Sequence, residues 1–439
     1  MNIAPDQVKK HFDEAPYPDI PFAESGNKDL NDLYRWSLIT PFYRKYQKLV
    51  DPAGMRVLDV GCGSGVVAQR LVEANPGIIL TGIDLSPKSV EVAQSRFAHH
   101  GYTGHEFIAM SAEELPKLNQ TFDYINCHET LYLLPNPLMG LQAMKAVLKP
   151  GGIIRANLHC YYQRMEYLRT QTFFQFLGVM EDCSLQTSIE LVKSFVDCLQ
   201  DYTRLKNTWN ASRKDDEFIT ANFILQGDKG FTIPQTFALL EAAGLDYISM
   251  VNWQFWKLSN LFVDPKNIPE EFSLIFEAAA DAELLYMYEL INPVNRLIDF
   301  WCGHNTTPTE YIPPAFLTMA DWSQRTIHVH PVIKDLRFAP KLDFRETLVK
   351  SIETSTLLPL NKIFTATSAG EISLPIDHCL CLYLLWERSL TFTELVELWA
   401  KLKPLNPLTL VPNTPEQTAQ ALITIVSFLE DRSLVLVTN

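Results

Sequence analysis

Three glycines at alternating positions, Gly61, Gly63 and Gly65, directly follow the apolar segment VLDV (residues 57–60). Glycine permits a tight turn and a close approach of a ligand to the backbone. The segment VVAQRLVEA after the turn has helical periodicity, so the N–H groups at its start would point towards that ligand. Asp84 ends the next apolar run, where a carboxylate can accept hydrogen bonds from ribose hydroxyls. The spacing therefore predicts a site for a ligand that contains a nucleoside.

Alternating strands and helices, from about residue 55 to residue 158, position these groups. The predicted strands are VLDV, IILTGIDL, HEFIAM, FDYINC and GGIIRANLHC. Ser86-Pro87 predicts the start of a helix that Gly101 ends, with serine as the N-cap and proline at the first helical position. Alternation of this kind predicts a parallel sheet with helices on both faces, which is an α/β fold.

Five motifs in this order resemble those of the class I methyltransferases that use S-adenosylmethionine (SAM), over about residues 45–160. They are VLDVGCGSG, GIDLS, Ser111-Ala112-Glu113, FDYINCHETLYLL and LKPGG. The resemblance implies a Rossmann-like, doubly wound, seven-stranded core, a transferase activity and SAM as the cofactor.

By this resemblance the glycine turn lines SAM, Asp84 binds the ribose, Ala112 and Glu113 border the adenine, and Cys127 and His128 lie near the methionine end. The cofactor residues predicted in this way are Asp59, Gly61, Cys62, Gly63, Gly65, Asp84, Leu85, Ala112, Glu113, Cys127 and His128. Each also has a purely structural interpretation: the glycines as turn formers, Cys62 as a packing residue, Asp84 as a helix-capping neighbour of Ser86, and His128 as an ordinary loop residue.

A nicotinamide-dependent dehydrogenase is the rival interpretation of the glycine turn. That class prefers the pattern GxGxxG, but Val66 and Val67 follow Gly65, so a third glycine at the required spacing is missing. The acidic Asp59 before the turn and the segment LKPGG also favour SAM.

The methyl acceptor is expected above the carboxyl ends of the strands, where open α/β sheets bind ligands. Its candidate contacts come from the N-terminal segment, the turn after the fourth strand and the segment after the fifth strand. They are Tyr17, Tyr34, Trp36, Tyr43, Glu129, Tyr132, His159, Tyr161 and Tyr162. Tyr17, Glu129 and His159 are the predicted catalytic residues. An amine acceptor must lose a proton first, so Glu129, His128 and His159 are the candidate bases.

The function predicted on these grounds is methyl transfer to a nucleophilic nitrogen or oxygen of a polypeptide or a small metabolite. The alternatives are a SAM-binding regulatory or scaffold protein and an RNA methyltransferase. The tetrapeptide NCHE after the fourth strand does not match the Asn-Pro-Pro-Tyr type of motif found in enzymes that methylate base amines. No metal site is predicted, since His328-x-His330 lacks a third ligand nearby.

A further resemblance concerns the segment FDEAPYPDIPFAES and the C-terminal region. Together they are similar to the bacterial protein-lysine methyltransferases of rickettsial type, which implies protein lysine as one acceptor.

The predicted organisation is an N-terminal lid segment (1–45), the core (46–258, with a helical insertion at about 160–232) and a second helical insertion (259–320). The last core strand RTIHVHPV lies with a linker in 321–338, and a small helical, winged-helix-like domain fills 339–439.

Charge and composition restrict the partners. The chain has 37 Lys and Arg against 51 Asp and Glu, a net charge of −14, which disfavours nucleic acid as a main partner. The sequence shows no signal peptide and no membrane-spanning run, so a cytoplasmic location is expected. A homodimer through the C-terminal domain is a further expectation.

Overall fold

The computed structural model describes residues 13, 17–18, 20–24, 30–181, 183–208, 215–334, 344–360 and 373–439. The chain divides into two compact units. Unit 1 comprises Met1–Phe22, Met55–Ala68 and Ile79–Thr307, and unit 2 comprises Ala23–Gly54, Gln69–Ile78 and Pro308–Asn439.

The main sheet of unit 1 has the strand order β3-β2-β1-β4-β5-β8-β7, and the short β6 pairs with the end of β5. The strands are β1 (Arg56–Val60), β2 (Ile79–Asp84), β3 (Glu106–Ala109), β4 (Phe122–Cys127), β5 (Leu148–Cys160), β6 (Gly230–Phe231), β7 (Leu245–Met250) and β8 (Leu297–His304). Strands β1 to β5 pair in parallel, whereas β8 is antiparallel to both β5 and β7. The sheet confirms the predicted doubly wound α/β core.

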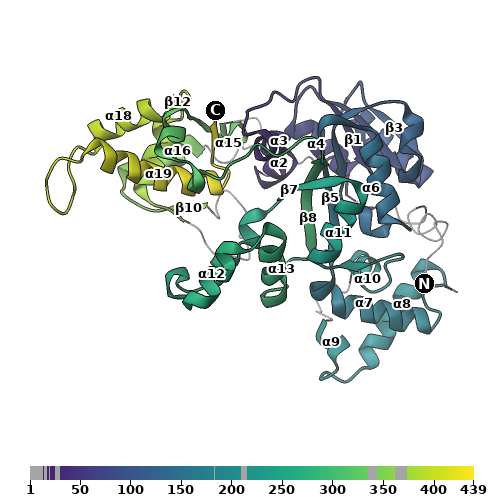
Figure 1. The fold of residues 1–439 in the computed structure, drawn as a ribbon. Helices are drawn as coiled ribbons and strands as arrows, with labels where there is room; N and C mark the ends of the chain where they lie inside the picture. Colours follow the sequence, from purple (N-terminus) through teal and green to yellow (C-terminus); the bar gives the residue numbers. More distant parts are fainter. Residues whose placement is uncertain are drawn as a thin grey trace. The chain divides into compact units, whose positions relative to one another are not determined.

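Local sequence signals set the helices that flank this sheet: α4 (Val66–Ala74), α5 (Pro87–His99), the 3₁₀ helix η2 (Ala112–Leu118), α6 (Pro137–Ala146) and α11 (Ile233–Ala243). The side chain of Ser86 accepts the N–H of Ser89 and Pro87 is the first residue of α5, which confirms the predicted start of that helix. Helix α11 ends at Gly244, which has φ +67°. Helix α11 packs on β7 and on α6 (Figure 1).

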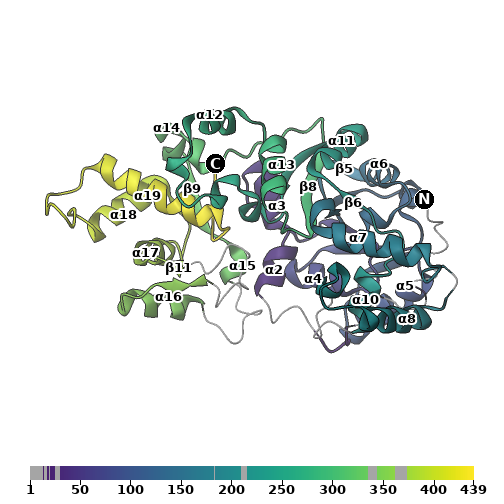
Figure 2. The same cartoon turned by 90° about the horizontal axis from the view of Figure 1, so that it is seen from below.

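The helical insertion predicted after the fifth strand is present as α7 (Tyr161–Phe176), α8 (Leu185–Cys198), α9 (Arg204–Thr208) and α10 (Asp216–Asn222). Figure 2 shows α7, α8 and α10 gathered together. They share a separate apolar cluster that includes Phe174, Ile189, Val192, Val196, Ile219 and Phe223. This cluster gives the insertion a core of its own. Polar side chains of α7, Arg164 and Gln171, donate to Asp228 in the segment that follows the insertion.

The prediction of the last core strand was wrong. RTIHVHPV forms β9 (Thr326–Val329), which pairs with β12 (Leu390–Thr391) and β13 (Val435–Thr438) in unit 2. The core strand is β8, within the segment predicted as a helical insertion (259–320). Strand β8 is buried at six successive positions, as an inner strand covered on both faces requires, whereas burial alternates along β9. The predicted boundary at 321–338 therefore falls inside unit 2.

The rest of the second insertion is helical, as predicted, but broken. Residues 269–291 form two helices, α12 (Glu270–Ala278) and α13 (Asp281–Ile291), because Ala279 and Ala280 are extended. The short helices η5 (Trp253–Trp256), η6 (Leu258–Leu261) and η7 (Pro265–Asn267) precede them.

Unit 2 contains helices around a small three-stranded antiparallel sheet. Its helices are α2 (Leu30–Trp36), α3 (Ile39–Tyr46), η8 (Pro314–Phe316), α14 (Met319–Ser323), α15 (Pro331–Lys334), α16 (Phe344–Glu353), α17 (Ile376–Leu384), α18 (Phe392–Leu402) and α19 (Pro415–Asp431), and β10 (Leu358–Pro359) pairs with β11 (Ser373–Leu374). The predicted capping boxes at Thr391 and Thr414 both form. Helices α18 and α19 lie side by side (Figures 1 and 2). None of the helices in the described ranges is long and apolar enough to cross a membrane.

Candidate cofactor and acceptor site

The glycine turn after β1 has a conformation that larger residues would strain. Gly61, Gly63 and Gly65 have φ values of +73°, +51° and +81°. A Cβ at Gly61 would lie 2.1 Å from the hydroxyl oxygen of Thr130, and one at Gly63 would lie 2.3 Å from the carbonyl oxygen of Tyr17. The turn therefore needs glycine both for its backbone angles and for its close neighbours.

Asp84, at the end of β2, ties this turn to the next helix. Its Oδ2 accepts the N–H of Gly63 at 2.9 Å, and its Oδ1 accepts the N–H of Ser86 at 2.9 Å. Burial raises the pKa of the Asp84 carboxyl, and the two backbone donors oppose that rise. The capping interaction considered from the sequence is thus present. Each carboxylate oxygen can also accept a further hydrogen bond from a ribose hydroxyl.

Asp59 and Asn126 are direct neighbours across β1 and β4, and both are buried. Asn126 Nδ2 donates to Asp59 Oδ1 at 2.7 Å. The other oxygens, Asp59 Oδ2 and Asn126 Oδ1, have no hydrogen-bond partner among the described residues. Burial raises the pKa of Asp59 to about 7. Buried polar atoms without partners are uncommon, so this pair of oxygens is suited to a ligand that brings hydrogen-bond donors.

The predicted adenine border lies at the start of η2. The hydroxyl of Ser111 donates to Glu113 Oε2 at 2.6 Å, and Ala112 is buried. The thiols of Cys62 and Cys127 are also buried, and burial raises the pKa of each well above its usual value. Both thiols are therefore neutral at physiological pH.

A short N-terminal segment lies against the glycine turn. Ser64 donates its N–H to the carbonyl of Tyr17 at 3.1 Å and its hydroxyl to the carbonyl of Pro18 at 2.7 Å. The buried Arg96 of α5 donates to the carbonyl of Ser64 at 2.9 Å and to that of Ile20 at 2.6 Å. Of the predicted lid (1–45), the part up to residue 22 belongs to unit 1. Tyr34, Trp36 and Tyr43 lie in unit 2, and their assignment as acceptor contacts stays a prediction.

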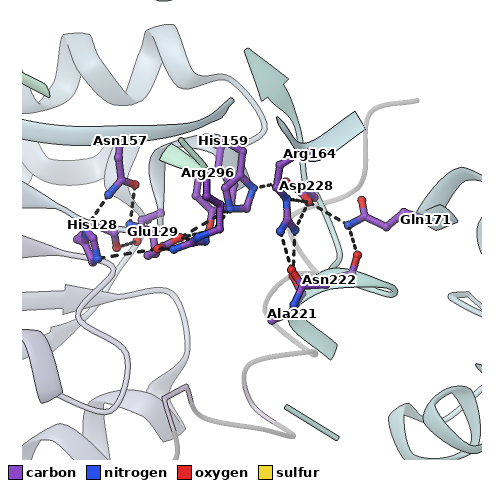
Figure 3. A network of polar contacts seen from close by, with 12 residues as sticks. His128, Glu129, Asn157, His159, Arg164, Gln171, Ala221, Asn222, Asp228 and Arg296 are labelled. Carbon is purple, nitrogen blue, oxygen red and sulfur yellow. Dashed lines mark hydrogen bonds and ion pairs between the residues drawn. The ribbon is translucent and has the colours of Figure 1, made fainter. Parts of the chain in front are cut away.

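The turn after β4 carries Glu129, whose backbone has a φ of +56°. Its carboxylate accepts from Arg296 Nη1 at 3.1 Å, from Arg296 Nη2, and from the hydroxyl of Tyr132 at 2.6 Å (Figure 3). Burial opposes ionisation, but Arg296 and His128 hold the pKa of Glu129 well below its usual value. Glu129 is therefore an anchor for Arg296 and, with its oxygens occupied by donors, is poorly suited to the predicted role of a base.

Asn157 of β5 fixes that turn. Its Oδ1 accepts the N–H of Glu129 at 2.9 Å, and its Nδ2 donates to His128 Nδ1 at 2.6 Å. A buried amide thus sets both the unusual backbone angle of Glu129 and the orientation of the His128 ring (Figure 3).

His159, near the end of β5, lies between two charged residues. Its Nδ1 is 2.6 Å from Asp228 Oδ1, and its Nε2 is 3.1 Å from Arg296 Nη1. The ring of Tyr132 stacks on the imidazole at 3.7 Å between centroids, with an interplanar angle of 24°. Burial lowers the pKa of His159, while its contact with Asp228 opposes that change.

Comparison with known proteins agrees with this geometry. Residues 51–207 match a family model described as a methyltransferase domain. The ubiquinone biosynthesis O-methyltransferase of Haemophilus ducreyi is 38% identical over 107 residues, which is 23% of this chain and 44% of that enzyme. The similar enzyme of Coxiella burnetii is 36% identical over 116 residues, 26% of this chain and 48% of that enzyme. The matches to these two enzymes thus span less than half of their length.

The chain carries a SAM-dependent methyltransferase domain. The residues present suit SAM, since the glycine turn admits a close ligand and two buried oxygens lack donors. The methyltransferase also resembles two solved structures of PKMT2 from Rickettsia typhi in fold. The first has a TM-score of 0.60 at 15% identity and covers 96% of this chain and 77% of that one. The second, in complex with AdoHcy, has a TM-score of 0.52 at 14% identity and covers 95% of this chain and 100% of that one.

An uncharacterized protein of a Synechococcus species is similar along more of the methyltransferase. It is 23% identical over 332 residues, which is 74% of this chain and 76% of that protein. The similarity to that protein thus extends well beyond the family model.

The methyltransferase brings the three predicted catalytic residues into one region. His159 Nε2 lies 3.7 Å from Glu129 Oε2. Burial raises the pKa of the Tyr17 hydroxyl, and Glu217 and Glu129 raise it further, which places Tyr17 within the field of the same carboxylate. Tyr161 and Tyr162 instead pack edge to face on each other outside this network.

Sequence reasoning missed four polar residues of the site: Asn126, Asn157, Asp228 and Arg296. The two asparagines lie at buried positions of β4 and β5, which is a usable signal, since a buried amide needs partners. Asp228 and Arg296 lie in connecting segments without a local pattern. His328 and His330 have hydrogen-bond partners within unit 2, and no group of three or more potential metal ligands is found in the described part of the chain.

Proposed function

We propose that this methyltransferase transfers the methyl group of SAM to a nucleophilic nitrogen or oxygen of a polypeptide or a small metabolite. The observation that supports this most directly is the convergence of two sets of residues at the carboxyl ends of β1, β2, β4 and β5. One set is the glycine turn with Asp84, and the other is the polar network of Glu129, His159 and Arg296 (Figure 3). Open α/β sheets bind their ligands at this edge.

On the cofactor side, we assign the predicted residues to the lining of the SAM site: Asp59, Gly61, Cys62, Gly63, Gly65, Asp84, Leu85, Ala112, Glu113, Cys127 and His128. Asp84 is positioned to accept from the ribose, because each of its oxygens has capacity beyond one backbone donor. Asp59 Oδ2 and Asn126 Oδ1 supply unsatisfied acceptors. SAM, when bound, supplies an electrophilic methyl group on a sulfonium; the protein supplies position and electrostatics.

On the acceptor side, the residues bind and orient the nucleophile. Holding reactants in a near-attack geometry can lower a barrier by roughly 7–11 kcal/mol, so no metal or covalent intermediate is needed. Tyr17 is 44% exposed and Arg296 is partly exposed, so both are available to an incoming molecule. The named relatives include enzymes of ubiquinone biosynthesis, an O-methylation, whereas the similarity to PKMT2 extends along nearly the whole chain. Both acceptor classes therefore stay within the proposal.

The charge of the chain supports an acceptor other than nucleic acid. A net charge of −14 repels phosphate backbones, so competing RNA should not reduce the methylation of the true acceptor.

We also propose a homodimer through the C-terminal part of unit 2. Light scattering on the full chain tests this, and a monomeric mass at micromolar concentration would contradict it.

Calorimetric titration of the full chain with SAM, AdoHcy and NAD tests the cofactor. Micromolar binding of SAM and AdoHcy without a response to NAD is the expected result. Incubation with methyl-labelled SAM and separated protein and small-molecule fractions of the source organism then tests the transfer. Label in either fraction supports the proposal, and SAM binding without any labelled product would favour a regulatory or scaffold protein instead.

A further inference from the structure

The protonation state of His159 follows from its two neighbours. Asp228 is an acceptor, because the Arg164 guanidinium and the Gln171 amide both donate to its carboxylate, and its pKa lies below the usual range in spite of burial. Nδ1 of His159 must therefore donate to Asp228 across the 2.6 Å contact. Arginine has only donors, so Nε2 must accept from Arg296 at 3.1 Å. The ring is neutral, carries its proton on Nδ1 and has its lone pair on Nε2.

Asp228 is held from several sides. Its Oδ2 accepts from Arg164 Nη2 at 2.7 Å and from Gln171 Nε2 at 2.9 Å, both on α7 (Figure 3). Arg164 in turn donates to Asn222 Oδ1 at 2.7 Å. The side chains of His159 and Asp228 are 1% and 0% exposed. The carboxylate therefore cannot leave the imidazole without breaking a buried network, which fixes the tautomer of His159.

Arg296 is more exposed than its two partners in this network, Glu129 and His159. Its side chain is 46% exposed, whereas that of His159 is 1% exposed. The guanidinium donates to both Glu129 and His159, so it covers the Nε2 lone pair. A group of the methyl acceptor can replace Arg296 as the hydrogen-bond donor to Nε2. It then meets a nitrogen lone pair whose orientation is already set.

We propose that His159 accepts the proton of the methyl acceptor at Nε2, that Asp228 is its positioning residue, and that the acceptor group is a hydroxyl. This rests on the proposed function. In the step, the hydroxyl oxygen forms a bond to the methyl carbon as the bond from that carbon to sulfur breaks. The electron pair of the broken bond stays on sulfur, which leaves AdoHcy, and the hydroxyl proton passes to Nε2 and then to solvent.

The hydroxyl is favoured over an amine by the timing of proton loss. An amine attacks after it has lost its proton, which solvent can remove beforehand, so a base aligned during attack adds little. A hydroxyl keeps its proton until attack begins, and a base within hydrogen-bond reach at that moment contributes roughly 10²–10⁴-fold. In addition, an ammonium acceptor would have to approach the Arg296 guanidinium, whose Nη1 lies 3.1 Å from Nε2.

The tautomer is tested without any acceptor by long-range proton–nitrogen NMR on histidine-labelled full chain, with His159→Gln to assign the signals. At pH 7.5 the expected signals are a protonated Nδ1 and an unprotonated Nε2. Asp228→Asn should shift the ring towards a mixture of tautomers, and the exposed Asp246→Asn should leave it unchanged. A protonated Nε2 or an imidazolium in the wild-type protein would overturn the assignment of His159 as the base.

The acceptor class is tested with methyl-labelled SAM and extract of the source organism, followed by analysis of the labelled bond. The expected product is a methyl ether. His159→Gln and Asp228→Asn should each lower kcat at least about 10-fold with unchanged SAM affinity. The pH dependence of kcat in Asp228→Asn should also differ from that of the wild-type protein. Label on nitrogen, or unchanged kcat in both variants, would overturn the inference. SAM binding with no label in any fraction would instead overturn the proposed function.

Discussion

The N–H of Gly63 donates to Oδ2 of Asp84 across 2.9 Å, so the carboxylate at the end of β2 holds the glycine turn at the end of β1. The same carboxylate accepts the N–H of Ser86 at the start of α5. One side chain thus holds both the glycine turn and the start of α5.

Replacing Asp84 tests this assignment. Asp84→Ala should weaken SAM binding at least about 10-fold, or roughly 1.4 kcal/mol, because both the ribose acceptor and the support of the turn are lost. Calorimetry measures the change, and Asp246→Ala on the exposed face of β7 is the matched control. Equal affinities of the two variants would contradict the placement of the ribose.

Asp59 should make the stability of the ligand-free protein depend on pH. Its pKa is about 7 in the folded state against about 3.9 when unfolded, so the folded state retains a proton that the unfolded state loses. The stability contribution is therefore complete below about pH 4 and is lost as the pH rises to 7. Asp59→Asn does not titrate, so its stability relative to wild type should increase over this range by up to roughly 4 kcal/mol.

Denaturant unfolding of both proteins at pH 5 and pH 8 measures this difference. The expected result is a larger advantage of the variant at pH 8. An equal difference at both values would show that Asp59 ionises normally.

Gly63 supports the N-terminal segment as well as the turn. Gly63→Ala should release residues 17, 18 and 20–22, because a Cβ there would lie 2.3 Å from the Tyr17 carbonyl oxygen. Gly104→Ala is the control, since Gly104 has φ +79° but a Cβ added there would have no atom within 4 Å. Faster amide exchange of Ile20 and Phe22 is expected in the first variant alone. If both variants behave alike, backbone strain and not the contact with Tyr17 governs the segment.

Arg96 should hold the same segment from the other side. Arg96→Met removes donors to the carbonyls of Ile20 and Ser64 and leaves these groups to water. We expect residues 20–22 to become sensitive to protease while the main sheet stays folded. The exposed Arg169→Met is the matched control, and protection that persists in Arg96→Met would rule out this anchoring role.

His330 should make unit 2 sensitive to acid. It is buried, hydrogen-bonded to Thr40 at 3.1 Å, and burial lowers its pKa to about 3. The unfolded state takes up a proton near pH 6.5, so the stability from this residue is complete above that value and is lost as the pH falls towards 3. The loss is about 1.4 kcal/mol per pH unit at most.

The slope of unfolding free energy between pH 6.5 and pH 4 measures this contribution. His330→Gln should flatten the slope, whereas His99→Gln, at an exposed position, should not. Equal slopes in wild type and His330→Gln would contradict the assignment.

The turns and helix ends of the core were predictable because their signals are local. A glycine turn, the acid at the end of the next strand, Ser86 as a cap and Gly244 as a helix end each depend on a few neighbouring residues. The same holds for the capping boxes at Thr391 and Thr414.

The strand assignments show where local signals fail. The segments 297–304 and 326–329 both suit a strand, but only the tertiary structure places β8 between β5 and β7 and places β9 in the small sheet of unit 2. Strand pairing is a long-range choice that neither segment encodes by itself, which is why the last core strand was assigned wrongly.

The sequence by itself determined the cofactor class and the order of strands and helices up to β5. The tertiary structure alone decided which polar groups surround Glu129 and His159. Arg296 and Asp228 lie 137 and 69 positions from His159 in the chain, and each contacts it directly. The pKa of a carboxyl group or an imidazole depends on burial and on the charges that folding places beside it, and no local sequence pattern encodes either.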